Sequence, residues 1–367
     1  MIPGPVELSP AVLAAAAGPP PGHTTPRLIE AFATSIERMR RVWRAAPASQ
    51  PFIVAGSGTL AMEMAAANLV EPGERTLVLN TGYFSERMTE ILRRYGSEVV
   101  EVGAPVGEVP AVEEVREALR RGEPFKALFA THVDTSTGLR VDPKPLCRLA
   151  RENGVLAVFD GVCATAGERF EMAEWDADLY FTGSQKAVGV PPGLALMVAS
   201  ERAMAVRTAR PSPPPPLFLD WDSWLPIHKA YEERRPSYFA TPSTSLVMAL
   251  EASLGEILED GVEARIAAHA RAAAFVRSAL GLRPVPRSEA VTANTLSALY
   301  FPEGIDATVL PKIAARGVIV AGGLHPAVRA TSFRIGHMGY TVTRPDYLER
   351  TVAAVAGAFE EVIAAAS

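Results

Sequence analysis

The chain has 367 residues, of which 48% are hydrophobic, and its formal net charge is −5. This length exceeds one typical domain and predicts a large domain with a smaller one beside it. With this acidic balance and no run of basic residues, nothing indicates an electrostatic partner such as nucleic acid or an anionic membrane. The apolar runs are also far too short to span a membrane.

Short apolar segments alternate with helical segments from about residue 50 to residue 200. The apolar segments predict strands at 51–55, 76–80, 98–102, 125–130, 155–159 and 178–181. The segments between them predict helices at 60–70, 85–95, 111–121 and 144–152. This order predicts an open, largely parallel, doubly wound α/β sheet, in which ligands bind beyond the carboxyl ends of the strands.

The proline-rich segment 211–216 interrupts this alternation and is interpreted as a stiff surface connector, with a polyproline ligand as the alternative. Helices are predicted at 243–260 and 262–280, strands at 296–301, 318–320 and 332–335, and a terminal helix from Arg344. These later elements suit a small α+β domain. The predicted division is an N-terminal segment 1–17, a large domain 18–255 and a small domain 256–367.

Cysteine and histidine patterns make a metal site or a disulfide framework improbable. The two cysteines, Cys147 and Cys163, have no CxxC spacing, and the six histidines form no metal-ligand motif. The first residues lack the charged start and long apolar stretch of a secretory signal. We therefore expect a reduced, cytoplasmic protein without a metal.

Lys186 stands out because it occupies a Gly/Ser/Pro-rich turn between two apolar runs. A lysine at a strand end, shielded from water, can have a pKa low enough to form a Schiff base with an aldehyde cofactor. Asp160, which directly follows an apolar run, could hold the ring nitrogen of such a cofactor. The alternatives are a solvated loop lysine and, for the aspartate, a helix cap or an ion pair.

Two further features fit a ligand site of this kind. Residues 56–59 read Gly-Ser-Gly-Thr between a strand and a helix, where free amides can receive a phosphate. The same segment fits a dinucleotide fingerprint, but the next strand ends in Asn80 instead of the acidic residue that binds ribose. Arg334 lies in an apolar strand-like run, where a substrate carboxylate or a structural ion pair would compensate its charge.

The chain resembles the class V aminotransferases of pyridoxal phosphate (PLP) fold type I, and among them the alanine–glyoxylate and serine–pyruvate group. The resemblance extends over nearly the whole sequence and depends most on two motifs, His-x-x-x-Ser-Thr-Gly at 132–138 and Ser-Gln-Lys…Pro-Pro-Gly at 184–193. Further matching segments are Gly4-Pro5, Gly22-His23, 56–58, 80–87, 158–160 and 333–336. It implies a seven-stranded type of sheet in the large domain.

The resemblance implies a role for each matching residue. Lys186 would form the Schiff base and move the proton, and Asp160 would pair with the pyridine nitrogen. Phe84 would stack on the ring, Thr135 would contact its phenolic oxygen side, and Arg334, with Gly4, would bind the substrate. The residues implied for the phosphate are Ser57, Gly58, Thr59 and Gln185, with Tyr238 and Thr241 reaching over from the other subunit of a homodimer.

The implied reaction is a ping-pong amino transfer from alanine or serine to glyoxylate or pyruvate. Another class V reaction remains open, such as an aminophosphonate or aspartate transaminase. A cysteine desulfurase is disfavoured because Gln185 precedes the lysine and no cysteine follows Cys163. A nicotinamide-dependent dehydrogenase and a non-catalytic PLP-binding protein are the alternatives from other classes. Cys163 is interpreted as a packed side chain, and His132 is expected to contact the site.

Overall fold

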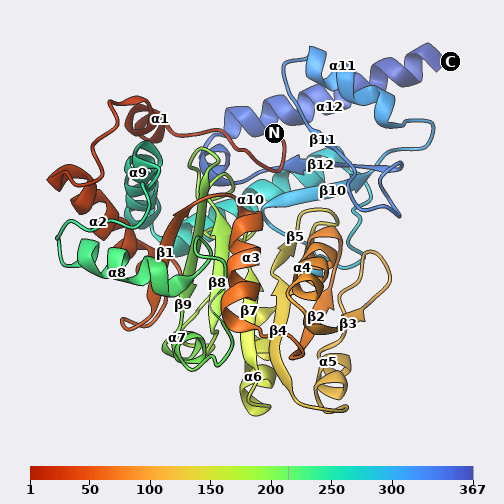
Figure 1. Cartoon of the computed structure of the whole chain (residues 1–367). Coiled ribbons are helices and arrows are strands. Elements are labelled where there is room, and N and C mark those ends of the chain that lie inside the picture. The colour runs from red at the N-terminus through yellow and green to blue at the C-terminus, as the bar shows by residue number, and fades with distance from the viewer. Residues whose placement is uncertain (214, 367) are drawn as a thin grey trace.

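The computed structural model describes residues 1–213 and 215–366 (Figure 1). Its centre is a seven-stranded sheet in the order β1-β9-β8-β7-β4-β2-β3. The strands are β1 (Gln50–Ala55), β2 (Arg75–Asn80), β3 (Glu98–Gly103), β4 (Phe125–Thr131), β7 (Leu156–Asp160), β8 (Leu179–Gly183) and β9 (Leu194–Ala199). Only β9 runs against its neighbours, β1 and β8. The prediction of a mostly parallel α/β sheet is thus confirmed, although no strand was predicted for β9.

Alternate residues of each strand enter different hydrophobic clusters on the two faces of the sheet. In β7, for example, Ala157 and Phe159 belong to one cluster, whereas Leu156 and Val158 belong to the other. This is the two-residue period that a strand buried on both faces requires. The clusters form because helices cover both faces, which defines a doubly wound sheet.

One face is covered by helices that include α3 (Gly58–Leu69), α4 (Tyr83–Arg94) and α7 (Glu201–Thr208). The other is covered by α2 (Pro26–Val42), α5 (Val112–Leu119), α6 (Pro143–Glu152) and α9 (Thr244–Asp260). Beside α9 lies α1 (Pro10–Ala17), and α8 (Trp221–Glu232) packs against α2. No helices were predicted for α1, α2, α7 and α8.

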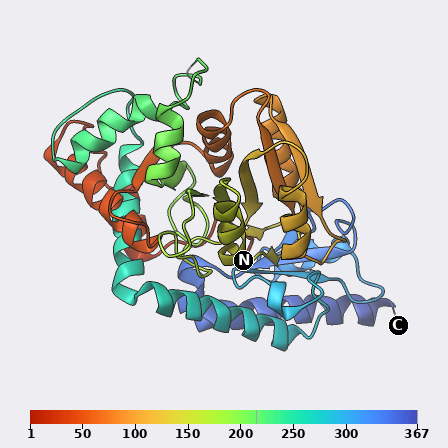
Figure 2. The ribbon, with the colours of Figure 1, turned by 90° about the horizontal axis from the view of Figure 1, so that it is seen from below.

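A second, three-stranded sheet lies above the carboxyl ends of the parallel strands in Figure 1. It has the order β10 (Leu296–Tyr300), β12 (Ser332–Gly336) and β11 (Ala321–Gly322). Figure 2 shows its long helices, α10 (Val262–Leu280) and α12 (Pro345–Ala366), side by side beneath it. The strand predicted at 318–320 was misplaced, since β11 begins at Ala321. The helix α9 continues across position 255, and the division into domains stays a prediction.

The remaining elements are short. They are the hairpin of β5 (Val133–Asp134) and β6 (Leu139–Arg140), the helix α11 (Leu310–Ala315), and three 3₁₀ turns, η1 (Glu289–Val291), η2 (Ala307–Val309) and η3 (Gly339–Thr343). Within the described part of the chain, no helix is long and apolar enough to cross a membrane.

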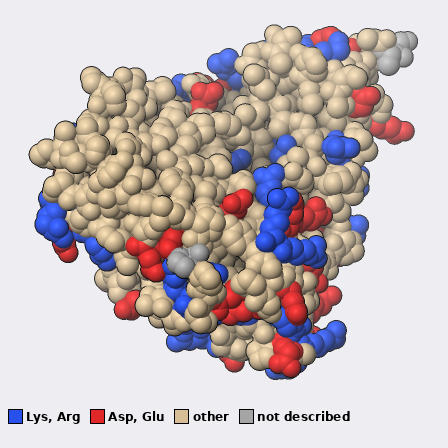
Figure 3. Space-filling model, viewed as in Figure 1, with Lys and Arg blue, Asp and Glu red and all other residues tan. Residues whose placement is uncertain are grey.

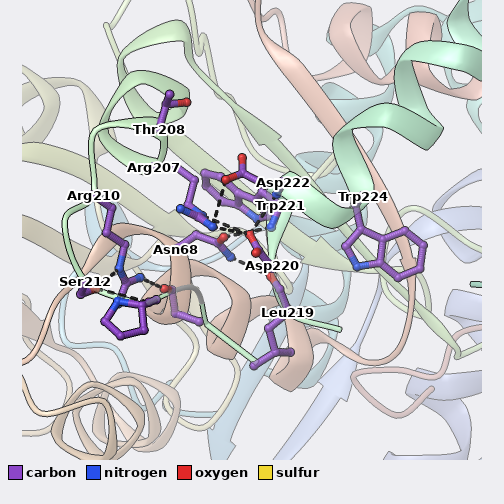
Figure 4. Close-up of polar contacts among 12 residues, drawn as sticks. Asn68, Arg207, Thr208, Arg210, Ser212, Leu219, Asp220, Trp221, Asp222 and Trp224 are labelled. Atoms are coloured by element: carbon purple, nitrogen blue, oxygen red, sulfur yellow. Dashed lines mark hydrogen bonds and ion pairs between the residues drawn. The ribbon is translucent and has the colours of Figure 1, made fainter. Parts of the chain in front are cut away.

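The proline-rich segment joins α7 to α8 on the surface, with Pro214 outside the described residues. A buried ion pair fastens its two ends: Arg207 donates to Asp220 from Nε at 3.1 Å and from Nη2 at 2.7 Å (Figure 4). Arg210 reaches the Ala67 carbonyl oxygen and pairs with Glu71. The connector is therefore anchored at both ends by paired charges.

Candidate active site

The carboxyl ends of β4, β7 and β8 and the start of α3 surround a cavity of about 150 Å³. The parallel pairing of β4 with β7 brings Thr131 of β4 beside Asp160 of β7. The cavity is lined by Ser57, Gly58, Thr59, Met62, Phe84, Arg87, Thr131, Val133, Thr135, Asp160, Val162, Cys163, Gln185 and Lys186. Most of the residues predicted for the cofactor are thus brought together here, from segments more than 120 residues apart.

Lys186 lies in the loop between β8 and the antiparallel strand β9, with its amine pointing toward the N-terminal segment. Nζ donates a hydrogen bond to the carbonyl oxygen of Pro3. Burial lowers the pKa of this amine, and the nearby Arg334 lowers it further, while Cys163 and Asp160 oppose the shift. A larger fraction of the amine is therefore neutral near pH 7 than for an ordinary lysine, as a nucleophile or a base requires.

Asp160 ends β7 and is 5% exposed. One carboxylate oxygen accepts a hydrogen bond from the Val162 amide at 2.8 Å, and no ion pair to this carboxylate occurs among residues 1–213 and 215–366. Burial raises its pKa to about 7, with a contribution from Asp134, although the Val162 bond and the charges of Lys186 and Arg87 oppose the rise. A buried carboxylate with one neutral partner can accept a strong hydrogen bond from a cationic N–H.

The first turn of α3 presents neutral donors to the cavity. Ser57 is the N-cap residue, and no side chain caps the helix. A Cβ atom at Gly58 would come within 2.8 Å of Val162, so the backbone approaches that side chain closely. The amide oxygen of Gln185 is buried without a hydrogen-bond partner. The backbone amides of this turn have no side-chain cap and can donate to an anion, which makes the turn a candidate anion cradle; the Gln185 oxygen is an acceptor and contributes nothing to it.

Asp134 fixes the start of α4 and thereby places Phe84. Its Oδ2 accepts from the amides of Phe84, at 3.1 Å, and Ser85, at 3.3 Å. Its Oδ1 accepts from the amide and hydroxyl of Ser136. The carboxylate therefore caps the start of the helix, and it accepts all of these hydrogen bonds. Phe84 projects from this fixed turn into the cavity.

Arg334 of β12 lies next to the cavity but does not line it. Its Nη1 donates to the Thr135 carbonyl oxygen at 3.3 Å, and its Nε donates to the Gly322 carbonyl oxygen at 2.9 Å. Burial lowers the pKa of this guanidinium, and the described residues offer it no carboxylate partner. A half-buried arginine bonded only to carbonyl oxygens retains the capacity to bind a carboxylate.

The N-terminal segment passes between the Lys186 loop and β12. The Val6 amide donates to the Gln185 carbonyl oxygen, and the Gly336 amide donates to that of Met1. Gly4 has a φ of +79°, and a Cβ atom there would lie 2.5 Å from Cδ of Lys186. Only glycine fits this close approach without displacing the lysine.

Three further residues named from the sequence do not line the cavity of this chain, and two of them, Tyr238 and Thr241, were predicted to reach the other subunit. Tyr238 is 62% exposed and packs against His23, with ring centroids 5.1 Å apart, and Thr241 is also exposed. His132 does not line the cavity, because its ring is buried against Tyr180 and Nδ1 lies 2.9 Å from that hydroxyl. The contact of His132 with the site is instead made by its backbone amide, which donates to the carbonyl oxygen of Asp160 at 2.9 Å.

Arg87 belongs to the matching segment 80–87, and no function was predicted for it. It lies three residues after Phe84, whose role was implied by the resemblance, and side chains three apart on a helix share one face, so this spacing could have indicated that Arg87 faces the site. In the structure it lines the cavity.

The open sheet with one reversed strand, and the buried lysine and aspartate at the carboxyl ends of its strands, match the PLP-dependent transferase fold type I that the sequence resemblance implies. Comparison with known proteins agrees. The family model described as Aminotransferase class-V matches residues 22–340. The chain belongs to the class V aminotransferase family, and it is a PLP-dependent aminotransferase.

Individual relatives match along nearly their whole length. The chain is 36% identical to alanine–glyoxylate aminotransferase 1 of Saccharomyces cerevisiae, covering 93% of this chain and 92% of the yeast protein. It is 33% identical to the L-aspartate–glyoxylate aminotransferase of Paracoccus denitrificans, over 92% of this chain and 85% of that protein. The crystal structure of an alanine–glyoxylate aminotransferase from Nostoc sp. superposes with a TM-score of 0.90 at 30% identity, covering 98% of this chain and 94% of that one.

Proposed function

We propose that the protein transfers the amino group of a small amino acid, alanine or serine, to glyoxylate or pyruvate. The two substrates would occupy the same site in turn. The observation that carries this proposal is the cavity in which a lysine of lowered pKa, a buried aspartate without an ionic partner and an anion cradle meet. The relatives named for alanine–glyoxylate activity support the choice of substrates.

The residues of the cavity fit pyridoxal phosphate. The part of the chain that the structure describes gives Asp160 no cationic partner, and a protonated pyridine nitrogen would supply one. The start of α3 suits a phosphate because no side chain caps its backbone amides, and the neighbouring Gln185 side chain can donate from Nε2. We propose Ser57, Gly58, Thr59 and Gln185 for the phosphate, Phe84 for the ring face and Thr135 for the phenolic oxygen side.

Bound there, PLP would supply an electron-accepting ring that stabilises the charge left when an amino acid loses its α-proton. The protein's own contribution would be to move that proton. Once free of the cofactor, the Lys186 amine can take up the proton at Nζ and release it again, since burial keeps its pKa low. The Pro3 carbonyl and Gly4 confine the lysine to this position.

Arg334 is proposed to bind the substrate carboxylate, with Gly4 beside it. Its Nη1 donates to the carbonyl oxygen of Thr135, and Thr135 and Lys186 line the same cavity. A carboxylate bound by this guanidinium would therefore lie on the side of the cavity that holds Thr135. One fixed cation selects one carboxylate, which suits alanine and serine.

We further propose that the protein is a homodimer in which Tyr238 and Thr241 reach the phosphate of the other subunit. Exposed apolar side chains support this: Leu13, Leu217 and Tyr238 are 52%, 69% and 62% exposed. Figure 3 shows a broad area over α1 and its neighbours with few charged side chains. Such a surface is typical of a contact between subunits. We also propose the cytoplasm as its compartment, since Cys147 and Cys163 are free thiols.

The test is an amino-transfer screen of alanine, serine, aspartate and aminoethylphosphonate against glyoxylate and pyruvate. We expect alanine or serine with glyoxylate to give the highest kcat/KM. Highest activity with aspartate, as the name of the Paracoccus relative would suggest, or with aminoethylphosphonate alone would contradict the proposed substrates. Absence of amino transfer with every pair of substrates would contradict the proposed reaction.

A further inference from the structure

The proposed phosphate cradle contains no fixed positive charge. Ser57, Gly58, Thr59 and Gln185 are neutral, and so are Tyr238 and Thr241, the residues proposed to come from the second subunit. A phosphate ester carries close to two negative charges at neutral pH. Backbone amides and a helix N-terminus compensate only part of that charge.

Among the described residues, only two basic side chains line the cavity, Lys186 and Arg87. The nitrogen of Lys186 would be engaged in the covalent bond to the cofactor. Arg87 is thus the remaining permanent cation, because a guanidinium keeps its proton under all ordinary conditions.

The position of Arg87 points toward the phosphate end of the site. Its Nη1 lies 3.4 Å from Oγ1 of Thr59, in the first turn of α3. Its Nη2 donates to the Tyr83 hydroxyl at 3.0 Å. The guanidinium carbon lies 4.9 Å from the ring centre of Tyr83 and 5.2 Å from that of Phe84. Two aromatic faces therefore fix the cation beside the cradle.

Arg87 is also half-buried without an acidic partner in residues 1–213 and 215–366. Other arginines of the same helix differ in this respect. Arg94 pairs with Glu90 at 2.6 Å, and Arg93 pairs with Glu101 at 3.0 Å, both on the exposed surface. The arginine that faces the cavity is the one left free to bind an anion.

We propose that Arg87 is a cofactor-binding residue that supplies the positive charge for the phosphate group of PLP, acting together with Thr59. This inference rests on the proposed function. It predicts that Arg87 distinguishes PLP from pyridoxal, which has the same ring and aldehyde but no phosphate.

The test compares the full-length wild-type protein with Arg87→Gln and Arg87→Lys after removal of bound cofactor. Dissociation constants for PLP and for pyridoxal are measured by the visible absorption band and by tryptophan fluorescence. A hydrogen bond to a charged group corresponds to a loss of roughly 10- to 100-fold in affinity. We expect Arg87→Gln to weaken PLP binding by about that factor and to leave pyridoxal binding unchanged, with Arg87→Lys in between.

The matched control is Arg94→Gln, on the same helix but on its exposed side. It should bind both compounds like the wild type. The preference of the wild type for PLP over pyridoxal should shrink at high salt, and the preference of Arg87→Gln should change less, since the contribution of Arg87 is partly electrostatic.

Equal weakening of PLP and pyridoxal in Arg87→Gln would overturn the inference, because Arg87 would then only hold Tyr83 and Phe84 in place. Unchanged binding of both would overturn it as well. If the wild type bound neither compound, the proposed function itself would fail. That result is distinct, since it would appear before any variant is made.

Discussion

Two groups of buried charges in this molecule are treated in opposite ways. Beside the connector, Arg207 and Asp220 are 7% and 8% exposed and satisfy each other at 2.7 Å, with Asp222 as a second acceptor (Figure 4). In the cavity, Asp160 and Lys186, and beside it Arg334, are bonded only to neutral backbone groups among the described residues. A charge that is buried and unpaired lowers the stability of the fold, so its presence indicates that a bound ligand supplies the missing partner. The paired group serves the fold, and the unpaired group serves the reaction.

The largest effect is expected for Lys186→Ala. Amino transfer should fall by at least about 1,000-fold, because both the covalent anchor and the proton-moving amine are lost. The free energy of unfolding of the cofactor-free protein should change little, since the buried amine has no ionic partner to lose. Steady-state kinetics and urea unfolding measure the two quantities, with the exposed Lys144→Ala as control. Activity within tenfold of wild type would place the lysine outside the reaction.

The next effect concerns Asp160 and pH in the cofactor-free protein. Its pKa is raised from an ordinary 3.8 to about 7, so the unfolded chain releases this proton at a lower pH than the folded one. Stability should therefore decline as pH rises from about 4 to 7, by roughly 4 kcal/mol from this group. Asp160→Asn should lack that decline. Urea unfolding of both proteins across this pH range measures the difference, and parallel curves would contradict the unpaired state of Asp160.

Asp220→Asn tests the paired group. Because asparagine keeps the helix-capping oxygen but not the charge, the variant leaves Arg207 buried without its main partner. We expect a loss of about 3 kcal/mol in the free energy of unfolding and unchanged kcat in the folded enzyme. Asp222→Asn, at the exposed partner, should cost less than about 1 kcal/mol. Thermal and urea unfolding measure both losses. Equal losses in the free energy of unfolding for the two variants would contradict the distinction between the buried and the exposed partner of Arg207.

The smallest effect is expected for Arg334→Gln. The KM for the amino donor should rise by about 10- to 100-fold, since a charged hydrogen-bond partner of the carboxylate is lost. The affinity for PLP should stay near wild type. Measuring both quantities separates the roles, and an equal loss in both would show that Arg334 shapes the cofactor site instead.

Local patterns in the sequence were sufficient for most of the sheet and for the centre of the site. Apolar runs that end in Asp160 or in the Lys186 turn mark strand ends, and strand ends of a parallel sheet meet at one edge. The strand β9 was not predicted because a short, continuous apolar run has no period that distinguishes a buried strand from a buried helical segment, and its reversed direction depends on its partners. The contact of Lys186 with Pro3 joins residues 183 positions apart, and that of Arg334 with Thr135 joins residues 199 apart. Such contacts depend on tertiary packing, which no local pattern records.

Borohydride reduction of the PLP-treated protein tests the central claim most directly. We expect a visible absorption band that disappears on reduction, followed by recovery of one modified peptide carrying the cofactor on Lys186. The lowered pKa of this amine makes it the preferred site of attachment over exposed lysines. Modification of other lysines, or a protein that stays colourless with added PLP, would contradict the assignment of the unpaired charges to a cofactor.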